Sequence, residues 1–357
     1  MKPVSCFLIV IITTMFELYT CLYKEKLRFQ KDKPFKILQM TDLHYGELIF
    51  WDLKSNQIQE KLIETTKPDL IIITGDAVTG YAFWSFLGFN PFFYQVNWWL
   101  FTRPYQKYKI PYAYVLGNHD HQGNYQYDQI AALDKTHDFS LMGTSPDGIP
   151  NYHVPIYASR NETEVATLLW MFYTNDFSCE DVVLSWGCFN SKEIDWYRKE
   201  IESLKSKQNI SNMDDFPSGL GFYHIPVPEF MTMYNTVPTT NKKNEGICCP
   251  RKNTGWFDIM KNEGKIRANF VGHDHNNYFS GFYKGVELVM GRKTGVGNYG
   301  PCCGNKRGGR VIEITEKEVN GKIDFDYSHY MVIEDGSIEQ NTEPTQKTDI
   351  QDTCDIL

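Results

Sequence analysis

The sequence predicts an α/β fold in which buried strands end in polar residues at one shared edge of a sheet. Short apolar runs, typical of strands buried on both faces, occur at Phe35–Met40, Leu70–Ile73 and Tyr112–Leu116. Between the first two, Ser55–Thr66 has apolar residues at helical spacing and is followed by Pro68, which gives a strand, helix, strand unit. In an open α/β sheet, ligands gather beyond the carboxyl ends of the strands. We therefore expect the residues that follow these runs to converge.

The side chains that follow the apolar runs are those of a metal site. Four strand ends supply carboxylates, an amide and imidazoles: Asp42 and His44, Asp76, Asn118 and His119, and His273 and His275. Residues two apart along an extended chain share a face, so His273 and His275 can meet one metal or two adjacent ones. These donors suit zinc, iron or manganese. The set exceeds what one tetrahedral zinc needs, which indicates two metals about 3.5–4 Å apart that share a carboxylate.

Together these blocks resemble the signature of the calcineurin-like metallophosphoesterases. They are Asp42-Leu43-His44, Gly75-Asp76, Gly117-Asn118-His119-Asp120, a later lone histidine, and Gly272-His273-Asp274-His275. The segment Gly221–Phe230 followed by the last block is similar to the purple-acid-phosphatase-like branch found in plants and fungi. The resemblance spans Phe35 to Ile314. It implies a four-layer αββα sandwich of two mixed β-sheets, the metallophosphoesterase fold, with a dimetal site at the strand tips.

The resemblance also implies a role for each site residue. The implied ligands are Asp42, His44 and His275 for one metal, Asn118, His224 and His273 for the other, and Asp76 as the bridge between them. Hydrolysis would proceed by in-line attack of a metal-bridging hydroxide on phosphorus. His119 would sit over the substrate and protonate the leaving oxygen or stabilise charge in the transition state. The alternative is that His119 is a core histidine bonded to Asp120.

One position departs from the family pattern. Purple acid phosphatases carry a tyrosine three residues after the bridging aspartate, and its phenolate bound to iron(III) produces their colour. Here that position is Thr79, and His44 fills the place that the tyrosine leaves. The resemblance therefore implies a colourless enzyme and weakens the expectation of an iron(III) site.

The amino-terminal segment 1–22 is typical of a secretory signal peptide. Its apolar core, Val4–Phe16, follows Lys2 and is shorter than the roughly 20 residues that span a bilayer. An uncleaved membrane anchor is the alternative. We expect a catalytic domain at 34–332, an acidic polar tail at 333–357, and a secreted or lysosomal/vacuolar protein.

Composition fits one large globular unit. The chain has 357 residues, of which 42% are hydrophobic, and a net charge of -8. This charge argues against nucleic acid or an anionic membrane as partner. We expect membrane contact only if the amino-terminal segment is uncleaved. The sequence does not indicate an oligomeric state.

The cysteines predict disulfide bonds in an exported chain. Cys179 and Cys188 can form a local bridge, and the adjacent pairs Cys248-Cys249 and Cys302-Cys303 could tie two loops together. Zinc binding by these thiols is disfavoured because no CxxC pair occurs. Glycosylation sequons begin at Asn161 and Asn209.

Three further segments carry expectations about the site. In the aromatic stretch Tyr81–Tyr108, we expect a helix at Tyr94–Phe101, while Tyr81–Phe89 could wall the substrate pocket. The glycine-rich stretch Gly291–Gly309 contains four cations, one of which could reach a substrate phosphate. The alternating runs from Tyr278 to Tyr330 predict antiparallel strands that close a second sheet.

The leading interpretation is a dimetal-dependent hydrolase of phosphate monoesters, similar to acid phosphatases. A phosphodiesterase or a protein phosphatase on the same site is the alternative, because the motifs define the metals and leave the pocket walls free. From another class, the chain could be a catalytically inactive secreted binding protein. The complete ligand set argues against this, since a decayed site should have lost at least one ligand.

Overall fold

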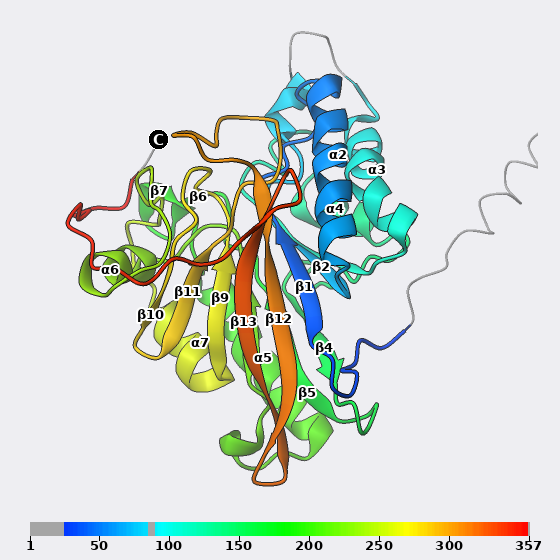
Figure 1. Ribbon diagram of the computed structural model, residues 1–357, viewed down its shortest axis with the longest axis vertical. Coiled ribbons are helices and arrows are strands. Elements are labelled where there is room, and N and C mark those ends of the chain that lie inside the picture. The colour runs from blue at the N-terminus through cyan, green and yellow to red at the C-terminus, as the bar shows by residue number, and fades with distance from the viewer. Residues whose placement is uncertain (1–24, 85–89, 356–357) are drawn as a thin grey trace, which may run out of the picture.

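The computed structural model describes residues 25–84 and 90–355, which form two six-stranded mixed sheets packed face to face with helices outside (Figure 1). This confirms the expected αββα sandwich. The expected signal segment 1–22 lies outside the described residues. The first sheet has the order β14-β13-β12-β1-β2-β3. Its strands are β1 Phe35–Met40, β2 Leu70–Thr74, β3 Tyr112–Val115, β12 Gly308–Val319, β13 Lys322–Ile333 and β14 Ile338–Glu339.

The second sheet has the order β10-β11-β9-β8-β5-β4. Its strands are β4 Tyr152–Tyr157, β5 Val165–Met171, β8 Gly219–Phe222, β9 Ile266–Val271, β10 Ser280–Tyr283 and β11 Val286–Met290. A separate hairpin consists of β6 Phe177–Cys179 and β7 Val182–Trp186. Each sheet contains a run of neighbouring parallel strands: β1, β2 and β3 in the first, and β5, β8, β9 and β11 in the second.

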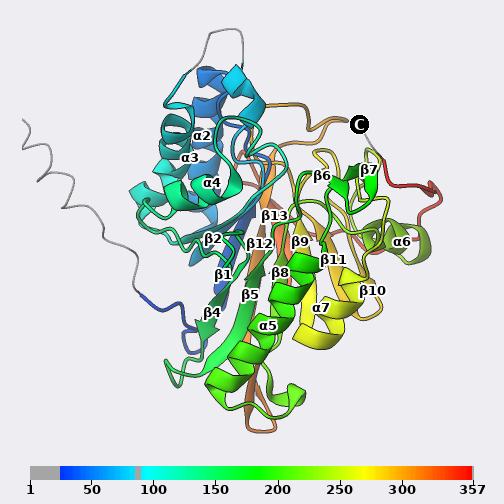
Figure 2. The same cartoon turned by 180° about the vertical axis from the view of Figure 1, so that it is seen from behind.

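Helices cover the outer face of each sheet (Figure 2). The first sheet is covered by α2 Ile49–Thr66, α3 Phe93–Tyr108 and α4 Tyr127–Asp134, and the second by α5 Ser191–Gln208 and α7 Trp256–Gly264. The shorter elements are α6 Glu229–Thr236, η1 Gly80–Trp84 and η2 Met213–Asp215. Among the described helices, none combines the length and the apolar character needed to cross a bilayer.

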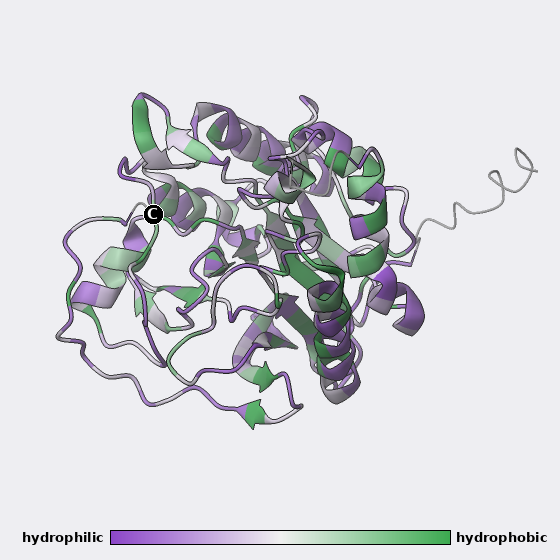
Figure 3. Cartoon of the chain, turned by 90° about the horizontal axis from the view of Figure 1, so that it is seen from above, coloured by the Kyte–Doolittle hydropathy of each residue, from purple (hydrophilic) through white to green (hydrophobic). Residues whose placement is uncertain are grey.

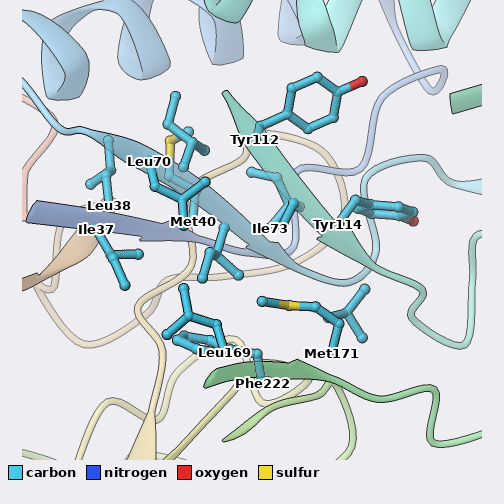
Figure 4. Close-up of a cluster of buried hydrophobic side chains, with 14 of the residues drawn as sticks. Ile37, Leu38, Met40, Leu70, Ile73, Tyr112, Tyr114, Leu169, Met171 and Phe222 are labelled. Atoms are coloured by element: carbon cyan, nitrogen blue, oxygen red, sulfur yellow. The ribbon is translucent and has the colours of Figure 1, made fainter. Parts of the chain in front are cut away.

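The core between the sheets fixes their relative position. Leu169 and Met171 of β5 and Phe222 of β8 point from the second sheet toward the first (Figure 4). They are buried in one cluster with Ile37 of β1 and Ile73 of β2. Because these strands are buried on both faces, they read as nearly continuous apolar runs, which is why they could be located from the sequence.

The expected strands near the carboxyl terminus exist, but two of them join the other sheet. The prediction placed them all in the second sheet; instead β12 pairs with β1, with Phe35 opposite Ile314, and β13 continues the first sheet. Only β10 and β11 lie in the second sheet. Antiparallel pairing can occur at any free sheet edge, so the alternation that marks these strands does not reveal their partner.

The disulfide expectations are partly right. Cys179 and Cys188 are bonded, as predicted. The predicted tie between the two adjacent pairs is wrong, because Cys249 bonds to Cys354 and Cys302 bonds to Cys303. Cys248 is a buried free thiol.

The described part of the acidic polar tail packs against the second sheet and its loops. Thr345 exchanges two backbone hydrogen bonds with Thr239, and the Gln351 side chain bonds the backbone of Ile247 in both directions. The Cys249–Cys354 disulfide then anchors its end.

We predict that Asp134→Ala lowers the free energy of unfolding by about 3 kcal/mol, because it leaves buried hydrogen-bond donors without an acceptor. The Asp134 carboxylate accepts hydrogen bonds from Trp98 Nε1 at 2.8 Å, Tyr112 OH at 2.7 Å and Ser140 Oγ at 2.5 Å. Chemical unfolding measures the change. The exposed control Asp352→Ala should change stability by less than about 0.5 kcal/mol. Equal free energies of unfolding in the two variants would contradict a stabilising role for the hydrogen bonds that Asp134 accepts.

Candidate metal centre

The loops at the strand tips turn sharply inward. Asp42, His44, Asp76 and His273 have φ angles of 53°, 53°, 52° and 78°, in the left-handed region that non-glycine residues seldom occupy. The extended alternation expected from the sequence therefore ends at these residues. Backbone strain of this kind clusters at functional sites. These backbone conformations direct the four side chains into the junction of the two sheets.

A first group of ligands meets at one point. Single donor atoms of Asp42, His44, Asp76 and His275 all lie within 4.8 Å of one another, and all four residues are buried. The Nε2 atoms of His44 and His275 are 3.2 Å apart, and His275 Nε2 is 3.4 Å from Asp42 Oδ1. These are the three residues expected to hold the first metal, together with the expected bridge.

The remaining expected ligands lie on the other side of Asp76. Asp76 Oδ2 is 3.3 Å from His224 Nε2 and 3.7 Å from His44 Nε2, so it stands between the two groups. His224 Nε2 is 3.0 Å from Asn118 Oδ1, and the ring centroid of His273 is 5.1 Å from that of His224. All seven predicted ligands are therefore brought together, and Asp76 occupies the position that a bridging ligand needs.

Hydrogen bonds at the outer ring nitrogens orient three of the histidines. Nδ1 of His224 donates to the backbone oxygen of Thr74 at 2.8 Å, and Nδ1 of His275 donates to that of Tyr299 at 2.9 Å. Nδ1 of His44 lies 3.0 Å from Thr79 Oγ1. In each ring Nε2 then faces the cluster, which is the arrangement of a metal-binding histidine with its supporting partner.

Glu47 supports this arrangement and was missed from the sequence. Its Oε1 accepts hydrogen bonds from the Thr79 hydroxyl at 2.8 Å and from Tyr81 OH at 3.3 Å, and its Oε2 accepts one from the backbone N–H of Asn298 at 2.8 Å. Glu47 thus holds the hydroxyl that orients His44. The sequence marked Thr79 as the place of an absent tyrosine, but it gave no sign of the carboxylate behind it.

Asp120 ties two strand tips together. Its Oδ2 accepts from the backbone N–H groups of Asp76 at 2.9 Å and Gly117 at 2.7 Å, and its Oδ1 accepts from that of Val78 at 3.0 Å. These contacts rigidify the loops after β2 and β3. Since both oxygens serve backbone groups, Asp120 is the support of these loops, and the alternative in which it bonds the His119 ring is not observed.

His119 lies at the half-buried entrance to the cluster. Its backbone N–H donates to Asp76 Oδ1 at 2.9 Å, and its Nδ1 is 2.8 Å from Gln122 Oε1. When Nδ1 donates to Gln122, Nε2 is the nitrogen that can exchange a proton with a substrate. The Tyr81 ring lies edge-on to the His119 ring, with centroids 5.3 Å apart.

The expectation that the stretch Tyr81–Phe89 walls the pocket thus agrees with the position of Tyr81. Residues 85–89 lie outside the described part of the chain. The other wall includes Trp186 of β7, whose ring centroid is 4.4 Å from that of His273. This contact could not be predicted from the sequence, because the β6–β7 hairpin itself was not predicted.

The electrostatics of the cluster favour bound positive charge. Burial would raise the pKa of Asp42, but His275 and His224 outweigh it and hold this pKa below its usual range. Burial would lower the pKa of His224, yet Asp76 and Asp42 raise it to about 9. Burial, reinforced by Lys293, keeps the pKa of His44 well below its ordinary value. The carboxylates are therefore ionised, while His44 is a neutral imidazole suited to a metal.

The donor set fits divalent cations. Both carboxylate oxygens of Asp42 and the Nε2 of His273 are buried without a hydrogen-bond partner. Buried polar atoms of this kind are costly unless something else satisfies them. Carboxylate oxygen and imidazole nitrogen together suit zinc, iron and manganese. Asp42, His44, Asp76 and His275 would hold such an ion on one side of the cluster, and His224, His273 and Asn118 face the other side.

A second group of potential ligands consists of Cys248, His273 and Asp274. Burial, with Asp274 adding to it, raises the pKa of the Cys248 thiol, whereas a metal needs the thiolate. Asp274 accepts hydrogen bonds from the Cys248 N–H at 3.2 Å and from Asn277 Nδ2 at 3.0 Å. Cys248 and Asp274 are therefore structural support for the loop that presents His273.

Of the four cations in the glycine-rich stretch, Lys293 comes closest to the ligands. Its buried Nζ donates to the backbone oxygen of Asp42 at 3.1 Å, so it lies behind a ligand. Arg292 and Lys306 pair with carboxylates, and Arg307 donates to the backbone oxygens of Gly295 and Gly300. The expectation of a cation on the substrate phosphate gains no support from these contacts.

Comparison with known proteins agrees with this geometry. A model of the family described as calcineurin-like phosphoesterase matches residues 35–277. A protein of Arabidopsis thaliana named probable inactive purple acid phosphatase 29 is 27% identical, covering 84% of this chain and 82% of the relative. The phosphatase DCR2 of Saccharomyces cerevisiae is 26% identical, covering 71% of this chain and 46% of that protein.

The fold also matches a solved structure. The crystal structure of a dimetal phosphatase from Danio rerio has a TM-score of 0.51 and 12% sequence identity, and the match covers 79% of this chain and 95% of that one. At this identity the similarity concerns the fold.

We predict that His44→Ala removes one bound cation per chain while leaving the other. The first ligand group would lose an imidazole, whereas His224, His273 and Asn118 would be unchanged. Metal analysis after gel filtration measures the ratio. His137→Ala, which removes an imidazole at the end of α4, should keep full metal content. Full occupancy in His44→Ala would disprove the assignment of His44.

We predict that Thr79→Val weakens cation binding by about 10- to 100-fold, because it removes the hydroxyl that orients His44 without changing the size of the side chain. Thr79→Ser keeps the hydroxyl and should bind nearly as tightly as wild type. Competition with a chelator gives both affinities. Equal affinities of the valine and serine variants would show that the hydrogen bond has no such role.

Proposed function

Because the chain belongs to the calcineurin-like phosphoesterase family, we propose that it is a hydrolase of phosphate monoesters that works with two bound divalent cations. The observation that carries this proposal is the convergence of six buried ligand side chains on the two sides of a seventh, Asp76. Cations bound there would activate a water molecule and offset the charge of a phosphoryl group. The family acts on phosphate esters, so such a group is the expected substrate.

The protein's own residues would complete the reaction. Asp120 and the neighbouring backbone hold the ligand loops in place, so little reorganisation is needed during the reaction. His119 stands at the half-buried entrance with Nδ1 engaged by Gln122. We assign it the transfer of a proton to the leaving oxygen, or stabilisation of the charge that develops there.

Two alternatives have specific support. The similarity to probable inactive purple acid phosphatases favours a binding protein without activity. Those names describe the relatives, whereas this chain has a complete set of predicted ligands. A phosphodiesterase would differ only in the pocket walls, to which Tyr81 beside His119 and Trp186 beside His273 would belong.

We also propose that the chain enters the secretory pathway and is secreted or lysosomal. The bonds Cys179–Cys188 and Cys249–Cys354 suit an oxidising compartment. The sequon residues Asn161 and Asn209 are exposed, as glycosylation requires. The apolar segment 1–22 is consistent with this route.

We predict that the metal-loaded protein cleaves p-nitrophenyl phosphate faster than bis-p-nitrophenyl phosphate, and that His119→Asn lowers kcat by about 10²- to 10⁴-fold. Metal content in the variant should equal that of wild type, since His119 is not among the ligands. Assays at several pH values with quantified metal measure both. Faster cleavage of the diester would move the function to phosphodiesterase, and loaded protein that cleaves neither ester would favour the binding role.

A further inference from the structure

Large apolar side chains are exposed at the starts of α2 and α3, the two neighbouring helices over the first sheet. We call this group the helical rim. Its residues are Leu48, Ile49, Phe50, Trp51 and Leu53 from α2 and Phe92, Val96 and Trp99 from α3. Phe50 is 80% exposed and Phe92 64%. Soluble surfaces seldom gather so many large apolar groups unless they bind something.

The two helix starts form one surface. The Phe93 ring and the Asn97 side chain pack so closely on Gly46, just ahead of α2, that a Cβ there would lie 2.7 Å and 2.9 Å from them. Farther along, Tyr105 OH of α3 bonds to Gln59 of α2, so the helices run side by side in the same direction. Figure 1 shows their starts together at the upper end of the molecule.

The helices themselves do not require these apolar residues. Leu48 and Phe92 occupy the positions just before α2 and α3, and neither side chain caps the helix by a hydrogen bond. Serine, aspartate or asparagine at such positions stabilises a helix by about 1 kcal/mol relative to apolar residues. Helix capping therefore does not account for the apolar side chains at these two positions.

The rim borders the entrance to the metal centre. Leu48 follows Glu47, which accepts hydrogen bonds from Thr79 and Tyr81. Tyr81 is itself 43% exposed, and its ring lies edge-on to the His119 ring. On the other side of the centre, the β6–β7 hairpin exposes Val183 and Leu184 at the same end of the molecule (Figures 1 and 2). Figure 3 views this end directly, with green apolar segments among purple ones.

The charges around the rim are positive. Lys54 and Arg103 are exposed, and neither pairs with a carboxylate among the described residues. Arg103 lies over the Trp99 ring, with its guanidinium carbon 5.4 Å from the centroid. The two acidic residues nearby turn inward: Asp52 is buried and accepts from the Gly46 N–H, and Glu47 faces Thr79. The rim therefore combines tryptophan, phenylalanine and aliphatic groups with cations.

We propose that the helical rim is a membrane-binding surface that inserts into the interface of a bilayer containing anionic phospholipid. Aromatic and aliphatic side chains flanked by lysine and arginine are the chemistry that this interface selects. A second copy of the chain is a poorer occupant, because a symmetric contact would bring Lys54 and Arg103 of both copies together without acids. The proposal does not depend on hydrolase activity, so its failure would leave the proposed function standing.

The net charge of -8 argued against an anionic membrane, but that argument treats the surface as a whole. Salt screens charges beyond a Debye length of about 8–10 Å. A docked face is therefore governed by the charges next to it, here Lys54 and Arg103.

Vesicle binding by the full chain tests the proposal. Vesicles of phosphatidylcholine with about 30% phosphatidylserine should bind the wild type, and Phe50→Ser/Trp99→Ser should lower the partition coefficient by about tenfold or more. The matched control Phe282→Ser/Val319→Ser removes exposed apolar groups from β10 and β12 and should bind as wild type does. Lys54→Gln/Arg103→Gln should lose about fivefold for each cation, and only on the anionic vesicles.

A second readout distinguishes the rim from the apolar segment 1–22, which is present in every sample. Brominated phospholipid should quench the emission of Trp51 and Trp99 in the wild type. Trp51→Phe/Trp99→Phe keeps apolar rings, so it should bind nearly as well but lose this quenching. Unchanged quenching in that variant, or equal partition of Phe50→Ser/Trp99→Ser and wild type, would overturn the proposal. The proposal would also be overturned if the wild type did not bind vesicles and instead formed a dimer that Phe50→Ser/Trp99→Ser dissociates.

Discussion

Burial of two carboxylates at the junction of the two sheets is the constraint on which the rest of the structure depends. Asp42 and Asp76 are each 1% exposed. An ion held away from water is costly by several kcal/mol unless opposite charge or hydrogen-bond donors surround it. Histidine nitrogens lie within 3.3–3.7 Å of both carboxylates, and the His119 N–H donates to Asp76. Asp42 has no such donor, which makes it the strongest reason to expect cations in this place.

The backbone around the carboxylates is arranged to make this close approach possible. A Cβ at Gly75 would lie 2.3 Å from His224 Nδ1, and one at Gly117 would lie 2.2 Å from Asp76 Oδ1. Only glycine lets three strand tips and the β8 loop come this near. The strained turns at Asp42 and His44 are fixed by backbone hydrogen bonds from their N–H groups to the oxygens of Gly75 and Asp76. The backbone strain at Asp42 and His44 is therefore tolerated because hydrogen bonds between neighbouring strand tips stabilise these turns.

The part of the fold that could be predicted from the sequence is the part buried on both faces. The strand Phe35–Met40 has the bounds that its apolar run predicts. Lys36 and Gln39 are the polar residues within it, and every residue except Lys36 is buried. By contrast, α7 and the β6–β7 hairpin were missed. Trp256 and Phe257 in α7 lie in a stretch where glycine and polar residues hide the helical spacing. The hairpin has exposed apolar residues, so it lacks the inward and outward alternation of an ordinary strand.

The candidate site also consists of a part that could be predicted from the sequence and a part that could not. Its ligands follow strands directly, so each could be located by what precedes it. The residues that orient them come from distant loops: Tyr299 supports His275 across 24 positions, and Lys293 reaches Asp42 across 251. Contacts between residues so far apart in the sequence depend on how the two sheets pack. A pattern of neighbouring residues in the sequence cannot predict this packing. The pairing of Cys249 with Cys354 has the same origin, since the tail must first cross the second sheet.

The threonine at position 79 changes what kind of metal the centre suits. Its hydroxyl stands between His44 and Glu47, so an imidazole with a polarising carboxylate behind it replaces a phenolate. Two tyrosines near the ligands have other contacts: Tyr81 donates to Glu47, and the Tyr299 ring stacks on His275 at 4.1 Å between centroids. With two imidazoles on each side of Asp76, both halves of the centre offer donors of similar softness. Under the proposed function, donors of this kind would suit borderline divalent ions better than hard trivalent iron.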